Sequence, residues 1–312
     1  MIDLELIKRK ALAAYIYVDY KFVLPLVSRL PASFSFKYST IRGHLNLAIG
    51  ADWAEYAVGF KYIKNRIQGS AHELLNSDHG KSLAVARYQT VSREEIDAFH
   101  INNGDYDEIP ATPSLNKYIH ELSQSIGSVV LTSHSDSFLL NLKGLSYSGR
   151  PIYVLTSAIV EDQRVHPAQR DFFKFKYRAA SRFLNGGKFI HTDSLNHSLI
   201  RSLEKNAIVV IAGETPGTNT SGEWIQWFGK YRLLPPGALR LANMTGSSLS
   251  AIMVEKKLIG DKIVVEWFCS PVFRQANLST FQSVFEFMEQ QIKMRPHAWW
   301  ASHLLTDYIN KD

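Results

Sequence analysis

From residue 127 onward, short apolar segments alternate with longer segments of helical spacing. Four short segments rich in β-branched residues are typical of buried strands, at 128–132, 152–156, 188–191 and 207–212. Helices are predicted between them, at 138–145, 169–184 and 195–205. Strands that alternate with helices indicate βαβ units. The sequence therefore predicts an α/β fold in which helices flank a mainly parallel sheet.

The segments on either side of this alternation complete the expected architecture. Further helices are predicted at 53–67, 79–99, 115–124, 237–243 and 279–294, and further strands at 248–255 and 262–268. A turn at Gly260 joins these two strands as a hairpin. We therefore expect a helical N-terminal region, residues 1–125, packed on an α/β catalytic core, residues 126–312.

The segment 11–30 is rich in apolar and aromatic residues, but charged residues interrupt it and Pro25 is expected to break any helix there. A membrane-spanning helix needs about 20 mostly apolar residues, which this segment does not supply. Two interpretations stay open. The segment lies in a membrane interface, with Lys8, Arg9 and Lys10 near anionic headgroups, or it packs on the domain core.

The composition limits the classes of function. With 46% hydrophobic and 21% charged residues, the chain is ordinary for a globular protein. Its formal charge of +6 favours an anionic membrane, a phosphorylated ligand or an acidic partner, and the lack of a long Lys/Arg block argues against nucleic acid. The single cysteine, Cys269, excludes an internal disulfide, and the eleven histidines are scattered. We expect a cytoplasmic protein with no permanently bound cofactor and no metal.

The predicted strand at 128–132 ends in a small polar loop that contains His134 and Asp136. In open α/β sheets, the ligand crevice lies at the carboxyl edge of the strands. Histidine has an ordinary pKa close to neutral pH, so His134 is a candidate general base. The alternative is a strand-end histidine bonded to a loop carbonyl. Asp136 orients this histidine or caps the helix that follows, and the cap is favoured.

The predicted strand at 207–212 delivers Glu214 into a loop of Gly, Pro and Thr residues. Two parallel strands that end in His134 and Glu214 bring both side chains to one edge of the sheet. A carboxylate beside an imidazole sets its tautomer and stabilises its protonated form. We therefore predict a His134–Glu214 pair, with backbone amides of the Gly-rich loop that carries Glu214 available to an oxyanion. The alternative is that Glu214 caps the following turn.

Charged and aromatic residues near these loops are candidates for binding a substrate. A Pro-Pro-Gly loop opens the helix that carries Arg240, and a helix start is a ready anion site. The candidates for holding a phosphate are Arg240, Arg232, Lys230 and Arg164. The alternative is that they form a solvated basic face. The candidates for an apolar substrate channel, with core packing as the alternative, are Trp224, Trp227 and Phe228. Trp299 and Trp300 are assigned to the core.

Together these blocks resemble the lipid A late acyltransferase (lauroyl/myristoyl acyltransferase-like) group of the lysophospholipid acyltransferase superfamily, which also includes the phosphatidylinositol mannoside acyltransferases. The resemblance starts weakly at 24–31 and 61–75, is better at 129–138, and is strongest over 208–249 and 295–303. It implies that a strand-end histidine takes the acceptor's proton. The acceptor then attacks the thioester carbonyl of an acyl carrier protein or coenzyme A, which is a co-substrate rather than a bound cofactor. It also implies membrane association on the cytoplasmic side.

The chain departs from the family at one position. The family motif places an Asp or Glu five residues after the histidine, where this chain has Leu139. Either Asp136 or Glu214 then orients His134, or the usual relay is lost, and the resemblance to the phosphatidylinositol mannoside enzymes favours Glu214.

The expected function is therefore acyl transfer from a carrier-protein or coenzyme A thioester to a hydroxyl or amine of a lipid or small-molecule acceptor. The expected location is the cytoplasm, with peripheral contact at the inner face of the membrane. Two alternatives stay open. One is transfer of an aminoacyl or peptidyl group from a peptidyl carrier protein in a specialised pathway. The other is a catalytically degenerate protein that binds a carrier or a lipid.

Overall fold

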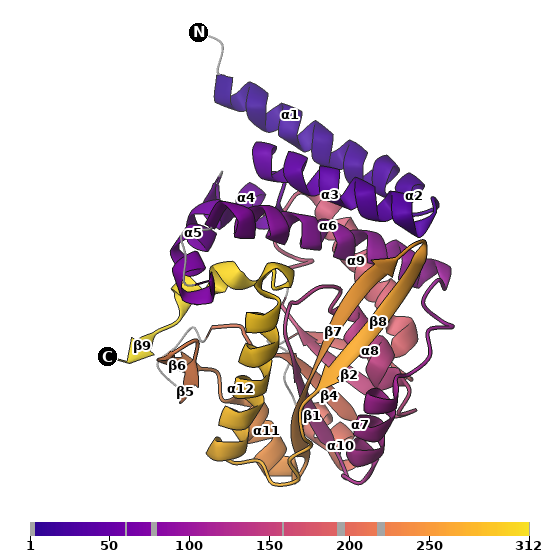
Figure 1. The fold of residues 1–312 in the computed structure, drawn as a ribbon, viewed down its shortest axis with the longest axis vertical. Coiled ribbons are helices and arrows are strands. Elements are labelled where there is room, and N and C mark those ends of the chain that lie inside the picture. The colour runs from indigo at the N-terminus through magenta and orange to yellow at the C-terminus, as the bar shows by residue number, and fades with distance from the viewer. Residues whose placement is uncertain are drawn as a thin grey trace.

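A six-stranded sheet in the order β3-β2-β4-β1-β7-β8 lies at the centre of the fold (Figure 1). The computed structural model describes residues 4–59, 61–75, 80–157, 159–191, 197–216 and 222–311. Five of the strands are parallel, and β8 is antiparallel to β7. The strands are β1 (Ser128–Thr132), β2 (Ile152–Thr156), β3 (Phe189–His191), β4 (Ile208–Ala212), β7 (Ser248–Ile259) and β8 (Lys262–Cys269).

Helices cover the sheet on both faces, and they lie both before the first strand of the chain and after it (Figure 1). Those before the first strand are α1 (Leu4–Val18), the π-helical η1 (Asp19–Val23), α2 (Leu24–Val27), α3 (Ala32–Ile49), α4 (Trp53–Val58), α5 (Tyr62–Leu75), α6 (Gly80–Asn103) and α7 (Pro113–Ser123). Those that follow are α8 (Leu139–Ser146), α9 (Pro167–Ala180), η2 (Ser181–Phe183), α10 (His197–Glu204), α11 (Gly237–Thr245), α12 (Leu278–Met294), η4 (Pro296–Ala298) and η5 (Ser302–Asp307).

The predicted α/β architecture is confirmed. Strands β1 and β2 have the predicted ends, because each apolar run is bounded by residues that interrupt a strand. The hairpin of β7 and β8 is also confirmed, with a turn at Gly260, whose φ of +62° favours glycine. The predicted helix at 53–67 is two helices, separated at Gly59 with a φ of +147°. The predicted starts of two helices, at residues 79 and 195, lie outside the described residues.

The two faces of the sheet build two apolar cores. Alternate residues of a strand point to opposite faces. On β1, Val129 and Leu131 pack with residues of α5, α10, α11 and α12, whereas Val130 packs with residues of α7, α8 and α9. Helix α6 contributes to both cores, through Tyr88 to the first and Ile96 to the second. The carboxyl edge of the sheet therefore lies between helices that belong to both layers.

The expectation that Pro25 breaks the helix is wrong. Helix α1 continues through η1 into α2, and Pro25 occupies the first turn of α2. Within a continuing helix a proline removes one backbone hydrogen bond and its ring crowds the preceding turn, and the wider π-helical turn before Pro25 accommodates the ring. Within the described residues, no helix combines the length and apolar composition needed to cross a bilayer.

A small second sheet was not predicted. Strands β5 (Glu223–Trp227) and β6 (Lys230–Leu234) form an antiparallel hairpin, and β9 (Asn310–Lys311) pairs with β6. The turn consists of Phe228 and Gly229, both with positive φ, as a tight hairpin turn requires. Charged and aromatic residues alternate here without an apolar run, which is why the sequence predicts no strand between residues 212 and 237.

Candidate active site

The parallel register of β1 and β4 brings the predicted pair together. Thr132 of β1 is paired with Ala212 of β4, and the backbone N–H of Gly213 donates to the Thr132 carbonyl over 2.9 Å. His134 and Glu214 each lie two residues beyond these partners. The two side chains therefore leave neighbouring strands at the same level of the carboxyl edge, as predicted.

His134 and Glu214 are in direct contact. Oε1 of Glu214 lies 2.5 Å from the imidazole Nδ1 of His134 and also accepts the backbone N–H of His134 over 2.5 Å. The Glu214 side chain is fully buried, whereas that of His134 is 25% exposed. The hydroxyl of Tyr308 donates to the backbone carbonyl of Glu214. Since the carboxylate occupies Nδ1, the remaining ring nitrogen, Nε2, is the one that a reactant can approach.

His134 lies in the wall of a cavity of about 980 Å³. Its volume is at the upper end of the range for small-molecule sites. The lining is mostly apolar and comes from both layers of helices, including Phe138, Leu142, Val154, Leu155, Phe173, Phe189, Leu199, Leu241, Phe281 and Phe285. Two cationic side chains, Lys176 and Arg240, and several Thr hydroxyls interrupt the apolar wall. The cavity thus suits a long apolar ligand with a few polar or anionic groups.

Two aromatic rings contact the imidazole of His134. The ring centroid of Phe138 lies 5.0 Å away, and that of Trp300 lies 4.5 Å away at an interplanar angle of 59°. The backbone N–H of Trp300 also donates to the His134 carbonyl over 3.1 Å. The assignment of Trp300 to the core is therefore wrong, because its ring lines the cavity, whereas Trp299 is fully buried as expected.

The carboxylate of Asp136 accepts a hydrogen bond from the backbone and does not contact the imidazole of His134. Its Oδ2 accepts the N–H of Lys256 on β7 over 2.7 Å, and its own N–H donates to the carbonyl of Ala298. Its φ of +49° lies in the left-handed region, and burial raises the pKa of its carboxyl. Asp136 does not line the cavity, and α8 begins after Phe138 with no side-chain cap. The prediction that Asp136 caps this helix is wrong, and its carboxylate has no contact with His134.

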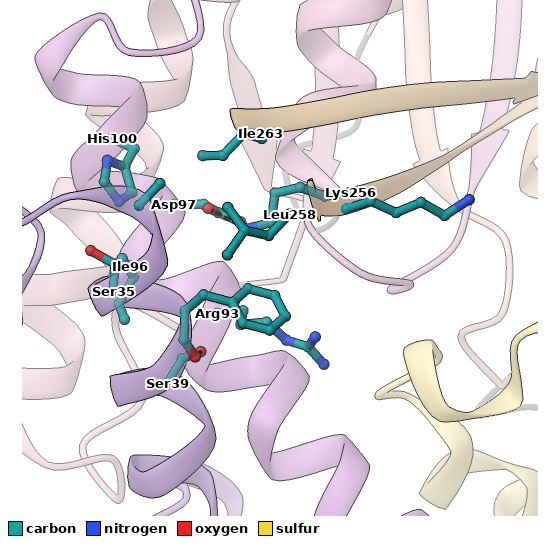
Figure 2. Close-up of a pocket in the computed structure, with 12 residues that line it drawn as sticks. Ser35, Ser39, Arg93, Ile96, Asp97, His100, Lys256, Leu258 and Ile263 are labelled. Carbon is teal, nitrogen blue, oxygen red and sulfur yellow. Dashed lines mark hydrogen bonds and ion pairs between the residues drawn. The ribbon is translucent and has the colours of Figure 1, made fainter. Parts of the chain in front are cut away.

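A second cleft, between α3, α6 and the β7–β8 hairpin, lies close to Lys256 (Figure 2). There the ammonium of Lys256 lies 2.5 Å from both carboxylate oxygens of Asp97. The cleft holds only about 20 Å³, which is room for about one water molecule. The Lys256–Asp97 ion pair connects the hairpin to α6, and the cleft itself is too small for a substrate.

Of the four predicted phosphate ligands, only Arg240 lines the cavity. It is exposed and lies in the first turn of α11, whose Gly237 and Ala238 also line the wall. Lys230 is paired with Glu73 at 2.5 Å, and the exposed Arg164 is paired with Asp162.

Arg232 is a buried structural residue. Its guanidinium donates to the carbonyls of Trp227 and Leu305, over 2.8 and 3.0 Å, and pairs with Glu73. Because Glu73 is 159 residues away along the chain, local sequence patterns cannot reveal that this cation faces inward to an acid.

Replacing Arg232 with methionine is expected to lower the free energy of unfolding by about 3–5 kcal/mol. The change leaves two buried carbonyls without their donor and removes one of the two cations paired with the partly buried Glu73, the other being Lys230. Denaturant unfolding followed by circular dichroism measures this. The matched control is Arg240→Met at an exposed position, which should change stability by less than about 0.5 kcal/mol. Equal stabilities of the two variants would contradict the structural role of Arg232.

The predicted channel residues do not line the cavity. Trp227 is fully buried and packs edge-on against Phe285, and Phe228 stacks on Trp299 with centroids 5.3 Å apart. Trp224 is 37% exposed on β5, on the small sheet. Core packing, the alternative interpretation, therefore holds for Trp227 and Phe228.

Three polar residues near His134 were not predicted. Glu94 on α6 accepts the indole Nε1–H of Trp300 over 2.8 Å and pairs with Lys176 on α9. Burial raises the pKa of Glu94, and the charge of Lys176 opposes this shift. His303 lines the cavity, and burial, followed by the charge of Arg87, holds its pKa well below the ordinary value. One signal was available, since the charged run Arg93-Glu94-Glu95 interrupts the helical pattern predicted at 79–99.

Of the loop predicted to supply oxyanion amides, residues 217–221 lie outside the described residues, and the amide of Gly213 donates to the Thr132 carbonyl. The candidate site therefore consists of the histidine pair, its aromatic neighbours and the cavity. No protein-family model matches the chain, and a search of curated proteins found no significant match. A function is therefore assigned from the residues and their geometry.

Proposed function

We propose that the protein is an acyltransferase that moves an acyl group from a thioester to a hydroxyl or amine, with His134 as general base. The observation that carries this proposal is the direct His134–Glu214 contact in the wall of a large apolar cavity. The Glu214 carboxylate holds Nδ1, which leaves Nε2 to accept a proton. The wall around it can accommodate an acyl chain, and Arg240 can pair with a donor phosphate.

The reaction follows from this arrangement. Nε2 of His134 removes a proton from the acceptor as the acceptor's oxygen or nitrogen bonds to the thioester carbonyl carbon. The carbon–sulfur bond then breaks, and the departing sulfur takes the proton from the imidazolium. Glu214 stabilises the imidazolium between these steps, because its full negative charge lies against Nδ1 in a buried setting. The resemblance to the lipid A late acyltransferase group agrees with this chemistry.

The acid missing at position 139 does not leave the histidine without a partner. Leu139 is fully buried in the core under α8, and Glu214 from the neighbouring strand contacts the imidazole. We therefore favour a working enzyme over a degenerate binding protein.

The test is the release of free thiol from a panel of donors: fatty acyl-coenzyme A, fatty acyl carrier protein and aminoacyl carrier protein, each with an acceptor extract. Consumption of a fatty acyl donor supports a lipid-type transferase, and consumption of the aminoacyl donor alone supports the specialised alternative. Background rates with every donor, unchanged in the His134 variant described below, would refute the proposal.

A peripheral membrane location forms part of this proposal. Among the residues that the structure describes, ten of the 20 exposed large hydrophobic side chains lie on α1, η1, α2, α3 and the turn after α2, at one end of the molecule (Figure 1). We call these residues the N-terminal apolar surface: Leu6, Ile7, Tyr17, Val18, Phe22, Leu26, Leu30, Phe34, Ile41 and Leu45. Exposed Arg9, Arg29 and Lys37 lie in the same segment. Apolar and basic side chains together are typical of helices that lie in an anionic interface.

A triple variant of this surface, Phe22→Ser/Leu26→Ser/Phe34→Ser, is expected to bind anionic vesicles at least about tenfold more weakly, since each lost side chain contributes on the order of 1 kcal/mol or more of apolar burial. Flotation with phosphatidylglycerol-containing vesicles measures this. The control is Tyr231→Ser/Val264→Ser/Met294→Ser, three exposed apolar residues elsewhere. Equal flotation of the two triple variants would count against the membrane assignment.

A further inference from the structure

We propose that Trp300, anchored by Glu94, is a positioning residue that holds the imidazole of His134 in its reactive orientation. This inference rests on the proposed function, because it concerns the same histidine. It assigns a purpose to a buried ion pair, Glu94–Lys176, that the acyl-transfer reaction itself does not use.

Backbone contacts attach the C-terminal segment, residues 298–300, to the histidine loop, residues 134–136. Ser135 and Trp299 form an antiparallel bridge, and the N–H of Trp300 donates to the His134 carbonyl. The N–H of Asp136 donates to Ala298 on the same segment. These backbone bonds fix the position of the Trp300 Cα relative to that of His134. They leave the indole free to rotate about its own side-chain bonds.

A hydrogen bond to Glu94 fixes that rotation. The indole Nε1–H donates to Oε2 of Glu94 over 2.8 Å, and Oε1 of Glu94 pairs with the ammonium of Lys176. Glu94 and Lys176 are 2% and 6% exposed. Two buried charges are costly unless they stay paired and hydrogen-bonded. Movement of Glu94 away from Lys176 is therefore unfavourable, and the carboxylate stays in one position. The position of the carboxylate in turn specifies the geometry of the indole.

The indole contacts the imidazole of His134. The centroid of the fixed indole ring lies 4.5 Å from that of the His134 ring. The carboxylate of Glu214 contacts the same imidazole at Nδ1. With Nδ1 hydrogen-bonded and the indole in contact with the ring, His134 cannot turn Nε2 away from the cavity without losing both contacts. When the ring is protonated during transfer, the indole also lies within the distance at which a tryptophan face attracts a cation.

A matched pair of variants tests the anchor. Glu94→Gln/Lys176→Met keeps an oxygen that can accept from Trp300 and leaves no unpaired charge, whereas Glu94→Leu/Lys176→Met removes that oxygen. We expect the leucine variant to have a kcat roughly 3- to 30-fold below that of the glutamine variant, which corresponds to the loss of one cation–aromatic contact. The KM values should agree, because Glu94 does not line the cavity. Equal kcat values with intact folding would overturn the role of Glu94.

A second measurement does not depend on activity. In histidine-labelled protein, the Hε1–Cε1 signal of His134 can be identified by its loss in His134→Gln. An indole this close shifts the signal, so Trp300→Leu should move it and Trp300→Phe should restore part of the shift. Trp224→Phe, which removes an indole from the small sheet, should leave it in place.

An unmoved signal in a folded Trp300→Leu protein would overturn the proposal. A signal that moves as expected in a protein inactive with every donor would refute the acyltransferase function and still support the positioning of His134. The two failures can therefore be told apart.

Discussion

Substitution of His134 by glutamine is expected to lower the rate of thiol release by about 100-fold to 10,000-fold, the range for loss of a general base. Glutamine has similar reach and keeps the backbone N–H that donates to Glu214. It cannot accept a proton from the acceptor. KM should change little, because one partly exposed residue of a wall of more than thirty residues is altered. Steady-state kinetics with the preferred donor of the panel measure both parameters.

The control for this variant is His120→Gln. His120 is an exposed residue of α7 that does not line the cavity, so its replacement should leave kcat unchanged. A His134→Gln enzyme within about threefold of the wild type would exclude His134 as the base and would require another group, such as His303, another histidine that lines the cavity.

Glu214→Gln is expected to lower kcat by roughly 100-fold or more, nearly as much as loss of the histidine itself. The amide preserves the shape of the fully buried side chain, and its oxygen can still accept from the His134 backbone. It lacks the charge that stabilises the imidazolium while the proton is on the ring. In the serine protease triad, a worked example of the same logic, replacing the buried acid by its amide costs about 10,000-fold.

The matched control is Glu289→Gln, because this carboxylate also accepts a backbone N–H, from Phe228 over 2.7 Å, but does not line the cavity. Its kcat should equal that of the wild type. If Glu214→Gln and Glu289→Gln have the same kcat, Glu214 is a structural residue of the loop and the proposed pair has no part in the chemistry. Unfolding midpoints of both variants exclude a trivial loss of folded protein.

Most of the sheet could be predicted because strand and helix patterns are local. Apolar runs of five residues specify β1, β2 and β4, and parallel strands place their carboxyl ends on one edge. This is why His134 and Glu214, 80 residues apart, were expected to meet. The prediction needed only that both strands end at the same edge of the sheet. Direct contact required, in addition, that β1 and β4 are neighbours.

The rest of the site could not be predicted, because it depends on which distant residue faces each side chain. Arg232 and Arg240 lie eight residues apart in similar surroundings, yet one is buried against Glu73 and the other is exposed at the cavity. Trp227 and Trp300 exchange their expected roles for the same reason.

By itself, the sequence determined the α/β class, the strand positions of the central sheet and the histidine–glutamate pair, because apolar periodicity and strand-end chemistry are short-range properties. Only the tertiary structure decided which cation, which tryptophan and which buried acid surround His134. These depend on the packing of α6, α9 and the C-terminal segment against the sheet edge. Such contacts join residues as much as 206 positions apart, and no local pattern records them.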